Sequence, residues 1–153
     1  MKIPLHFSQV EGRIWIPCTL MSSRYRLGLS SITFVVDTGS TDTIISPADA
    51  FRLHLPINSL KNQEEEPYVV IGGNKFKRKK AVGITLMFRD DKGNAKQFIY
   101  DPTIIESTKQ DQDSLKLAYS LPSLLGVDFL LKNKLSLHFI PHKETVYLES
   151  EDV

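Results

Sequence analysis

Residues 32–40 read Ile-Thr-Phe-Val-Val-Asp-Thr-Gly-Ser, an apolar run that ends in a carboxylate followed by threonine and glycine. The β-branched and aromatic side chains of residues 32–36 favour a buried β-strand. Such a strand delivers Asp37 to a tight turn, where Gly39 permits a close backbone approach that a side chain would block. The Thr38 hydroxyl can hydrogen-bond locally in the same turn. The stretch therefore predicts a positioned and partly desolvated carboxylate, a state suited to chemistry.

Two further landmarks follow in order. A glycine pair, Gly72-Gly73, lies near the middle of the chain, and the apolar segment 121–130 contains Leu124-Leu125-Gly126. Together with Asp37-Thr38-Gly39-Ser40, these landmarks resemble the retroviral-type (retropepsin-like) aspartic proteases. In that family a strand enters Asp-Thr-Gly-Ala/Ser, a glycine-tipped flap hairpin follows, and two apolar residues and a glycine lead into a short helix and a final strand. The resemblance covers roughly residues 30–140, and the three landmarks together are specific where each alone is weak.

The resemblance implies an all-β fold, a retropepsin-like half-barrel with a flap hairpin and one or two short helices. It implies an aspartic endopeptidase that binds an extended polypeptide and hydrolyses it without metal or other cofactor. The implied site residues comprise the catalytic Asp37, the active-site turn residues Thr38, Gly39 and Ser40, the flap residues Ile71, Gly72 and Gly73, and the supporting residues Leu124, Leu125 and Gly126.

Length and composition fit a single soluble domain spanning residues 1–153, with its core at about 13–140. The chain has 41% hydrophobic and 24% charged residues, and its formal net charge of +1 indicates neither nucleic acid nor an acidic membrane as partner. A lone cysteine, Cys18, excludes an intrachain disulfide framework. Residues 1–8 lack the apolar core of a signal peptide, and no run is long enough to span a membrane, so we expect a cytoplasmic protein. The four histidines show no metal-ligand clustering: His6, His54, His138 and His142.

The local pattern predicts mostly strands. Short runs rich in β-branched and aromatic residues, separated by turn formers, lie at 13–21, 31–36, 68–71, 81–88, 97–100 and 135–139. One short helix is expected after Ser46, because proline follows this capping residue and Asp49 lies three residues beyond it. The polar stretch Glu106–Lys116 is predicted to be a mobile loop.

Aspartic protease chemistry needs two carboxylates that share one proton, one as general base and one as the acid that polarises the scissile carbonyl. This chain offers one such carboxylate, Asp37. The other Asp-x-Gly, Asp91-Lys92-Gly93, follows charged residues and reads as an exposed hairpin turn. For Asp128 the resemblance implies a helix start at which the polar residue is structural. The second carboxylate must therefore be Asp37 of another copy, which a two-fold homodimer supplies.

Two of the landmarks also have a plainer interpretation. Asp37 can be a turn former that caps a strand, and Gly72-Gly73 can be an ordinary hairpin turn. The basic run Lys75–Lys80, the extension before residue 30 and the segment 141–153 depart from the family pattern. They keep open a catalytically inactive retropepsin-like peptide-binding or dimerisation module. A third alternative is a nucleic-acid-associated module that binds through the basic run.

Overall fold

Strand β4 (Leu27–Val36) runs through the middle of the larger of two sheets and ends at Asp37. The computed structural model describes residues 1–151. Toward its end β4 buries alternate side chains, Ile32, Phe34 and Val36, because successive residues of a strand face opposite sides of a sheet. It pairs antiparallel with β3 (Arg13–Ser22) and parallel with β11 (Ser123–Leu125), whose last residue lies opposite Val36.

In this ten-stranded sheet, β11 lies between the end of β4 and the start of β5. The strand order is β6-β7-β10-β5-β11-β4-β3-β8-β9, and β2 also pairs with β3. The remaining bounds are β2 (His6–Ser8), β5 (Ile44–Ile45), β6 (Tyr68–Ile71), β7 (Asn74–Lys80), β8 (Thr85–Arg89), β9 (Ala95–Ile99) and β10 (Thr103–Ser107).

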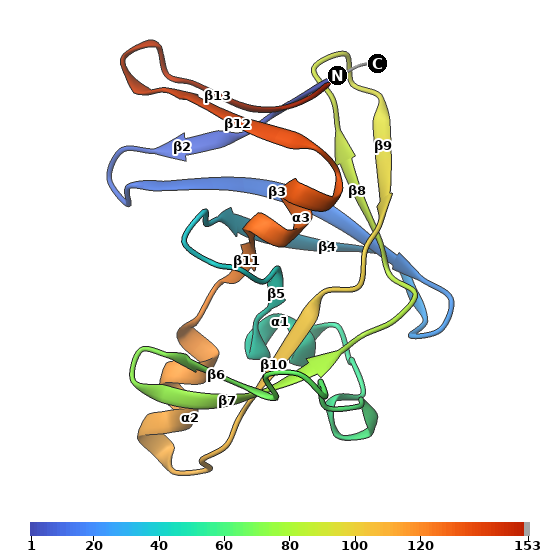
Figure 1. The fold of residues 1–153 in the computed structure, drawn as a ribbon, viewed down its shortest axis with the longest axis vertical. Coiled ribbons are helices and arrows are strands. Elements are labelled where there is room, and N and C mark those ends of the chain that lie inside the picture. Colours follow the sequence, from blue (N-terminus) through green and yellow to red (C-terminus); the bar gives the residue numbers. More distant parts are fainter. Residues whose placement is uncertain (152–153) are drawn as a thin grey trace.

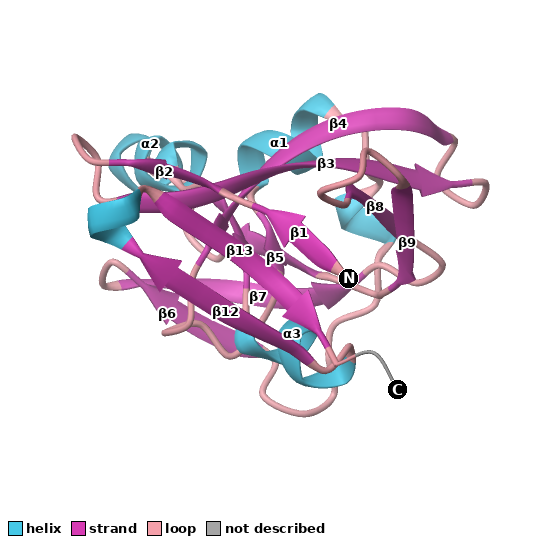
Figure 2. Ribbon diagram, turned by 90° about the horizontal axis from the view of Figure 1, so that it is seen from above, coloured by secondary structure: helices cyan, strands magenta, loops and turns pink. Residues whose placement is uncertain are grey.

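The second sheet brings the two ends of the described chain together. Strand β13 (Thr145–Ser150) lies between β1 (Lys2–Pro4) and β12 (Leu135–Ile140), and both pairings are antiparallel. Figure 2 shows these three strands as a separate layer. In Figure 1, β12 and β13 lie at the top and the β6–β7 hairpin with α2 at the bottom, with β4, β5 and β11 between them.

Short helices fill the connections. They are α1 (Pro47–Arg52), α2 (Gln112–Ser120) and α3 (Val127–Lys132), with 3₁₀ turns η1 (Ile57–Ser59) and η2 (Pro141–Lys143). No helix within residues 1–151 has both the length and the apolar character needed to cross a membrane.

Two apolar clusters support the site. In the main core, the Phe129 ring on α3 packs edge-on against Phe88, Phe98 and Tyr100, with centroids 5.3–5.8 Å apart. This packing fixes α3, which directly follows Gly126. The second cluster lies beneath the β6–β7 hairpin and contains the buried residues Ile44, Phe76, Ile105 and Ala118.

The all-β class is confirmed, and the predicted helix is present as α1. The Ser46 hydroxyl accepts a hydrogen bond from the Asp49 N–H at 3.2 Å, as a capping residue should. The prediction of a mobile loop over Glu106–Lys116 is wrong, because β10 extends to Ser107 and α2 begins at Gln112. Asp111 caps α2 by accepting hydrogen bonds from the Ser114 N–H at 3.0 Å and its hydroxyl at 2.8 Å.

Candidate active site

The turn after β4 holds Asp37 through its own backbone. The Asp37 N–H donates to the Leu125 carbonyl at 3.0 Å, which ties the turn to β11, and the Ser40 N–H donates to the Asp37 carbonyl at 3.1 Å. The Gly39 N–H donates to Asp37 Oδ1 at 2.9 Å. One carboxylate oxygen is thereby oriented by the turn, as its sequence predicted, while Thr38 and Gly39 are exposed.

Gly126 lies against the loop that continues from this turn, residues 37–43, which we call the Asp37 loop. A Cβ atom at Gly126 would lie 2.4 Å from the Asp42 carbonyl oxygen and 2.9 Å from that of Ser40. The Val127 N–H donates to the Ser40 carbonyl at 2.9 Å. The start of α3 therefore packs directly on the Asp37 loop, at a spacing that only glycine allows.

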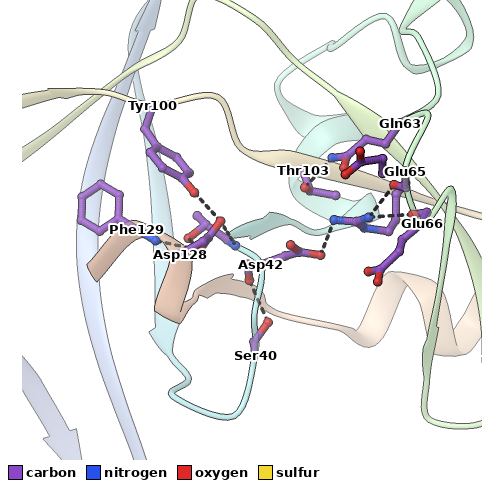
Figure 3. Close-up of polar contacts among 11 residues, drawn as sticks. Ser40, Asp42, Gln63, Glu65, Glu66, Tyr100, Thr103, Asp128 and Phe129 are labelled. Atoms are coloured by element: carbon purple, nitrogen blue, oxygen red, sulfur yellow. Dashed lines mark hydrogen bonds and ion pairs between the residues drawn. The ribbon is translucent and has the colours of Figure 1, made fainter. Parts of the chain in front are cut away.

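Asp128 binds the far end of the Asp37 loop. Its carboxylate accepts hydrogen bonds from the Thr43 N–H at 3.0 Å and the Thr43 hydroxyl at 2.8 Å, and a further one from the Tyr100 hydroxyl (Figure 3). Thr43 Oγ1 in turn accepts from the Gly126 N–H at 3.0 Å. Burial, followed by the hydrogen bond to Asp128, raises the pKa of Tyr100, so this hydroxyl stays protonated as a donor.

Asp42, the residue before Thr43 in the same loop, pairs with a cation from the β6–β7 hairpin. Asp42 Oδ2 lies 2.8 Å from Nη2 of Arg78, whose side chain is only 9% exposed. The Ser40 hydroxyl donates to the Asp42 carbonyl at 2.7 Å. Asp42 and Asp128 are thus both engaged in holding the loop that presents Asp37.

A cavity of about 250 Å³ opens beside Asp37. Its walls are mainly apolar, with Arg13 and Asp37 as the charged members; they comprise Arg13, Val35, Asp37, Ile44, Ile71, Ile105, Leu121, Pro122 and Leu124. Residues predicted from all three landmarks meet here, because Ile71 comes from the hairpin and Leu124 from β11. An apolar pocket beside an oriented carboxylate suits an apolar side chain next to a reacting bond.

The predicted flap is the β6–β7 hairpin. Gly72 and Gly73 form its turn with φ angles of 59° and 80°, the left-handed conformations that a two-residue type I′ turn requires. A Cβ on Gly72 would lie 3.4 Å from the Leu117 side chain of α2, so the hairpin tip lies close to this helix. Gly72 and Gly73 lie outside the cavity lining, which Ile71 reaches.

A larger cavity, of about 680 Å³, lies between α1 and α2 and does not include Asp37. Its lining carboxylate, Glu106, is paired with Lys79 at 3.5 Å. We therefore place the candidate site at the smaller cavity, where an oriented carboxylate faces open space. Within residues 1–151, no three side chains of the His, Cys, Asp and Glu types gather as a metal site requires.

The site predicted from the sequence includes Asp37, the glycines and the Leu124-Leu125-Gly126 segment, but not Thr43, Arg78 and Tyr100, which contact the Asp37 loop or its partners. Thr43 sits six residues after Asp37 with no motif to mark it, and Tyr100 reaches Asp128 from 28 residues away. Arg78 lies in a basic run that looks solvated in the sequence, yet it is buried.

Comparison with solved structures supports the fold. A retropepsin-like aspartic protease from Rickettsia conorii superposes with a TM-score of 0.58 and 20% sequence identity, covering 98% of this chain and 91% of that one. The retroviral protease-like domain of Ddi1 from Leishmania major gives a TM-score of 0.47 and 17% identity, covering 91% of this chain and 96% of that one. No family model matches the sequence, and a search of curated proteins finds no match. The chain therefore has the retropepsin-like fold.

Proposed function

We propose that the protein is an aspartic endopeptidase that acts as a homodimer, with one Asp37 from each copy. The observation that carries this proposal is the Asp37 carboxylate itself. It is oriented by the Gly39 N–H and lines an apolar cavity together with Ile71 of the flap. Hydrolysis by direct attack of water requires such a group to act as general base, with a second carboxyl group beside it as the acid.

The second carboxylate is best supplied by another copy, because the other candidates in this chain have different roles. Asp42 is paired with Arg78, and Asp128 is hydrogen-bonded to Thr43 and Tyr100. Asp91 lies in the turn between β8 and β9, as its sequence predicted. A two-fold axis beside Asp37 would bring two identical carboxylates together, and their mutual repulsion would keep one of them protonated.

The dimer would be joined by preformed sheets rather than by free terminal strands. β1 and β13 pair with each other within the chain, in the register Lys2 opposite Glu149.

The substrate we propose is an extended polypeptide with an apolar residue beside the scissile bond. The cavity walls favour such a side chain, and the flap backbone can bind an extended peptide as an added strand.

The test is cleavage of an unfolded protein, such as casein, from about pH 3 to about pH 8, with light scattering to follow the oligomeric state. We expect the wild type to cleave wherever the dimer is present, and Asp37→Asn to dimerise without cleaving. Asp91→Asn is the matched control, since it alters the other Asp-x-Gly and should leave cleavage intact. A stable dimer with no Asp37-dependent cleavage at any pH would favour a peptide-binding module instead.

A further inference from the structure

Residues 63–67 directly precede β6 of the flap hairpin and are strained; we call this segment the flap hinge. Glu66 has a φ of 48°, a left-handed conformation that costs free energy in a residue other than glycine. Pro67 follows it and restricts its backbone further. Strain of this kind persists only where surrounding contacts hold it in place.

Arg78 supplies those contacts. Its Nη1 donates to the Glu66 carbonyl at 2.6 Å and to the Glu65 carbonyl at 3.2 Å. Its backbone N–H donates to the Pro67 carbonyl at 2.8 Å, and its own carbonyl accepts from the Gln63 N–H at 2.9 Å. The hinge is therefore bonded to a single residue of β7 through both side chain and backbone.

The other arm of the same guanidinium reaches the Asp37 loop. Nη2 lies 2.8 Å from Asp42 Oδ2, five residues after Asp37. Figure 3 shows Asp42 between Asp128 on one side and the hinge residues Glu65 and Glu66 on the other. One buried cation thus joins the loop that carries Asp37 to the segment that leads into the β6–β7 hairpin.

Stability alone does not explain this arrangement. Arg78 is 8% exposed and its Nε atom is buried without a hydrogen-bond partner among residues 1–151. A buried ion pair is often no more stabilising than well-packed apolar residues of similar volume. The planar guanidinium group of Arg78, however, can orient a carboxylate and two carbonyl groups simultaneously, which an apolar side chain cannot.

We propose that Arg78 is a positioning residue that couples the flap hinge to the Asp37 loop, so that the position of the flap and the orientation of Asp37 change together. The consequence for catalysis rests on the proposed function. The coupling itself is a property of the unliganded chain and can be measured without activity.

The test is hydrogen exchange in four variants, read over residues 37–43 and 65–75 at times too short for global unfolding. In Arg78→Met we expect exchange in both segments to accelerate by about tenfold, because the hinge and the loop lose a shared partner. Asp42→Asn, the milder change, should accelerate both segments by about threefold, since an amide oxygen can still accept a hydrogen bond. Glu66→Gly keeps the carbonyl and relieves the strain, so it should leave the Asp37 loop unchanged.

Lys79→Met is the matched control. Lys79 is the next residue of β7 and is equally buried, but its ammonium group binds the Ile57 carbonyl at 2.8 Å and Glu106 at 3.5 Å. Exchange in the Asp37 loop should stay at the wild-type rate in this variant. The coupling is overturned if Asp42→Asn affects only its own loop, or if Lys79→Met reproduces the pattern of Arg78→Met.

Peptide cleavage separates this inference from the proposed function. Arg78→Met should lower kcat/KM by about tenfold, Arg78→Lys should recover part of that loss, and Lys79→Met should match the wild type. Coupled exchange without any Asp37-dependent cleavage would refute the protease while leaving the coupling in place. Asp37-dependent cleavage with uncoupled exchange would refute the role of Arg78 alone.

Discussion

At the scale of single residues, Gly126 is the glycine at which the surrounding packing leaves the least space for a side chain. We expect Gly126→Ala to destabilise the fold by about 2–3 kcal/mol, because the new Cβ would lie 2.4 Å from a backbone oxygen of the Asp37 loop. Urea unfolding measures this loss. Gly28→Ala is the control, since nothing lies within 4 Å of a Cβ there, and it should stay within about 0.5 kcal/mol of the wild type. Equal effects of the two substitutions would contradict the close packing of α3 on the loop.

Cys18 gives a second prediction at this scale. Burial raises the pKa of its thiol from 9.0 to about 12, with a smaller opposing effect from a hydrogen bond to the Met87 backbone. Above pH 9 the unfolded chain loses this proton while the folded chain keeps it, so the contribution to stability is complete below pH 9 and is lost as pH rises toward 12.

Urea unfolding near pH 8 and near pH 10 checks that sign. Between the two pH values the wild type should lose about 1 kcal/mol more stability than Cys18→Ala, which lacks the thiol. Lysines and tyrosines titrate in both proteins, so the difference isolates Cys18. Identical pH dependence would show that the thiol is accessible to solvent.

At the scale of elements, Ser123 connects β11 to the start of α1. Its hydroxyl donates to Asp49 Oδ2 at 2.6 Å and accepts from the Ser46 N–H at 2.9 Å. In a usual capping box the acidic side chain would bind that N–H directly, but here Ser123 bridges the two groups. The cap of α1 therefore also fixes the strand that lies beside β4.

Ser123→Ala should cost about 2 kcal/mol, because it leaves a buried N–H and a carboxylate oxygen without this partner. Thermal unfolding provides the measurement. Ser120→Ala is the control, since the exposed Ser120 hydroxyl donates only to the Leu117 carbonyl in the preceding turn. A loss no greater than that of the control would mean that the bridge contributes nothing measurable.

Local sequence signals predict some of these elements but not others. The turn at Asp37 and helix α1 follow from local signals, because β-branched runs, glycine and a capping serine act over a few residues. Helix α2 was missed because its sequence is polar and it buries only Ser114 and Ala118. Its packing against β10 and the β6–β7 hairpin is a tertiary effect that a short stretch of sequence does not reveal.

The same limit applies to the polar contacts of the site. The pairing of Arg78 with Asp42 crosses between elements 36 residues apart, and local sequence patterns carry no signal for it. Basic side chains are usually exposed, as Lys75 and Lys80 are, whereas Arg78 and Lys79 of the same run are buried. Alternation along β7 would place Arg78 on the same face of the strand as Phe76. It would not identify Asp42 as the partner of Arg78.

At the scale of the whole molecule, the proposed activity depends on two copies that form one site. In the proposed dimer, each chain would supply an oriented Asp37, an apolar wall and a flap, and the acid partner would come from the other copy. Such an arrangement would make activity a property of the dimer, and mixing subunits that differ only at Asp37 tests this.

The most direct measurement is cleavage by wild-type protein mixed with Asp37→Asn protein and left to exchange subunits. The amount of wild-type protein is held constant. When an equal amount of variant is added and the subunits pair at random, the total activity should fall to about half that of the wild-type protein alone, and excess variant should lower it further. Asp91→Asn protein added in the same amounts should cause no such loss. If activity stays constant or rises as the Asp37→Asn protein is added and mixed dimers are present, one Asp37 suffices and the shared-carboxylate mechanism is wrong.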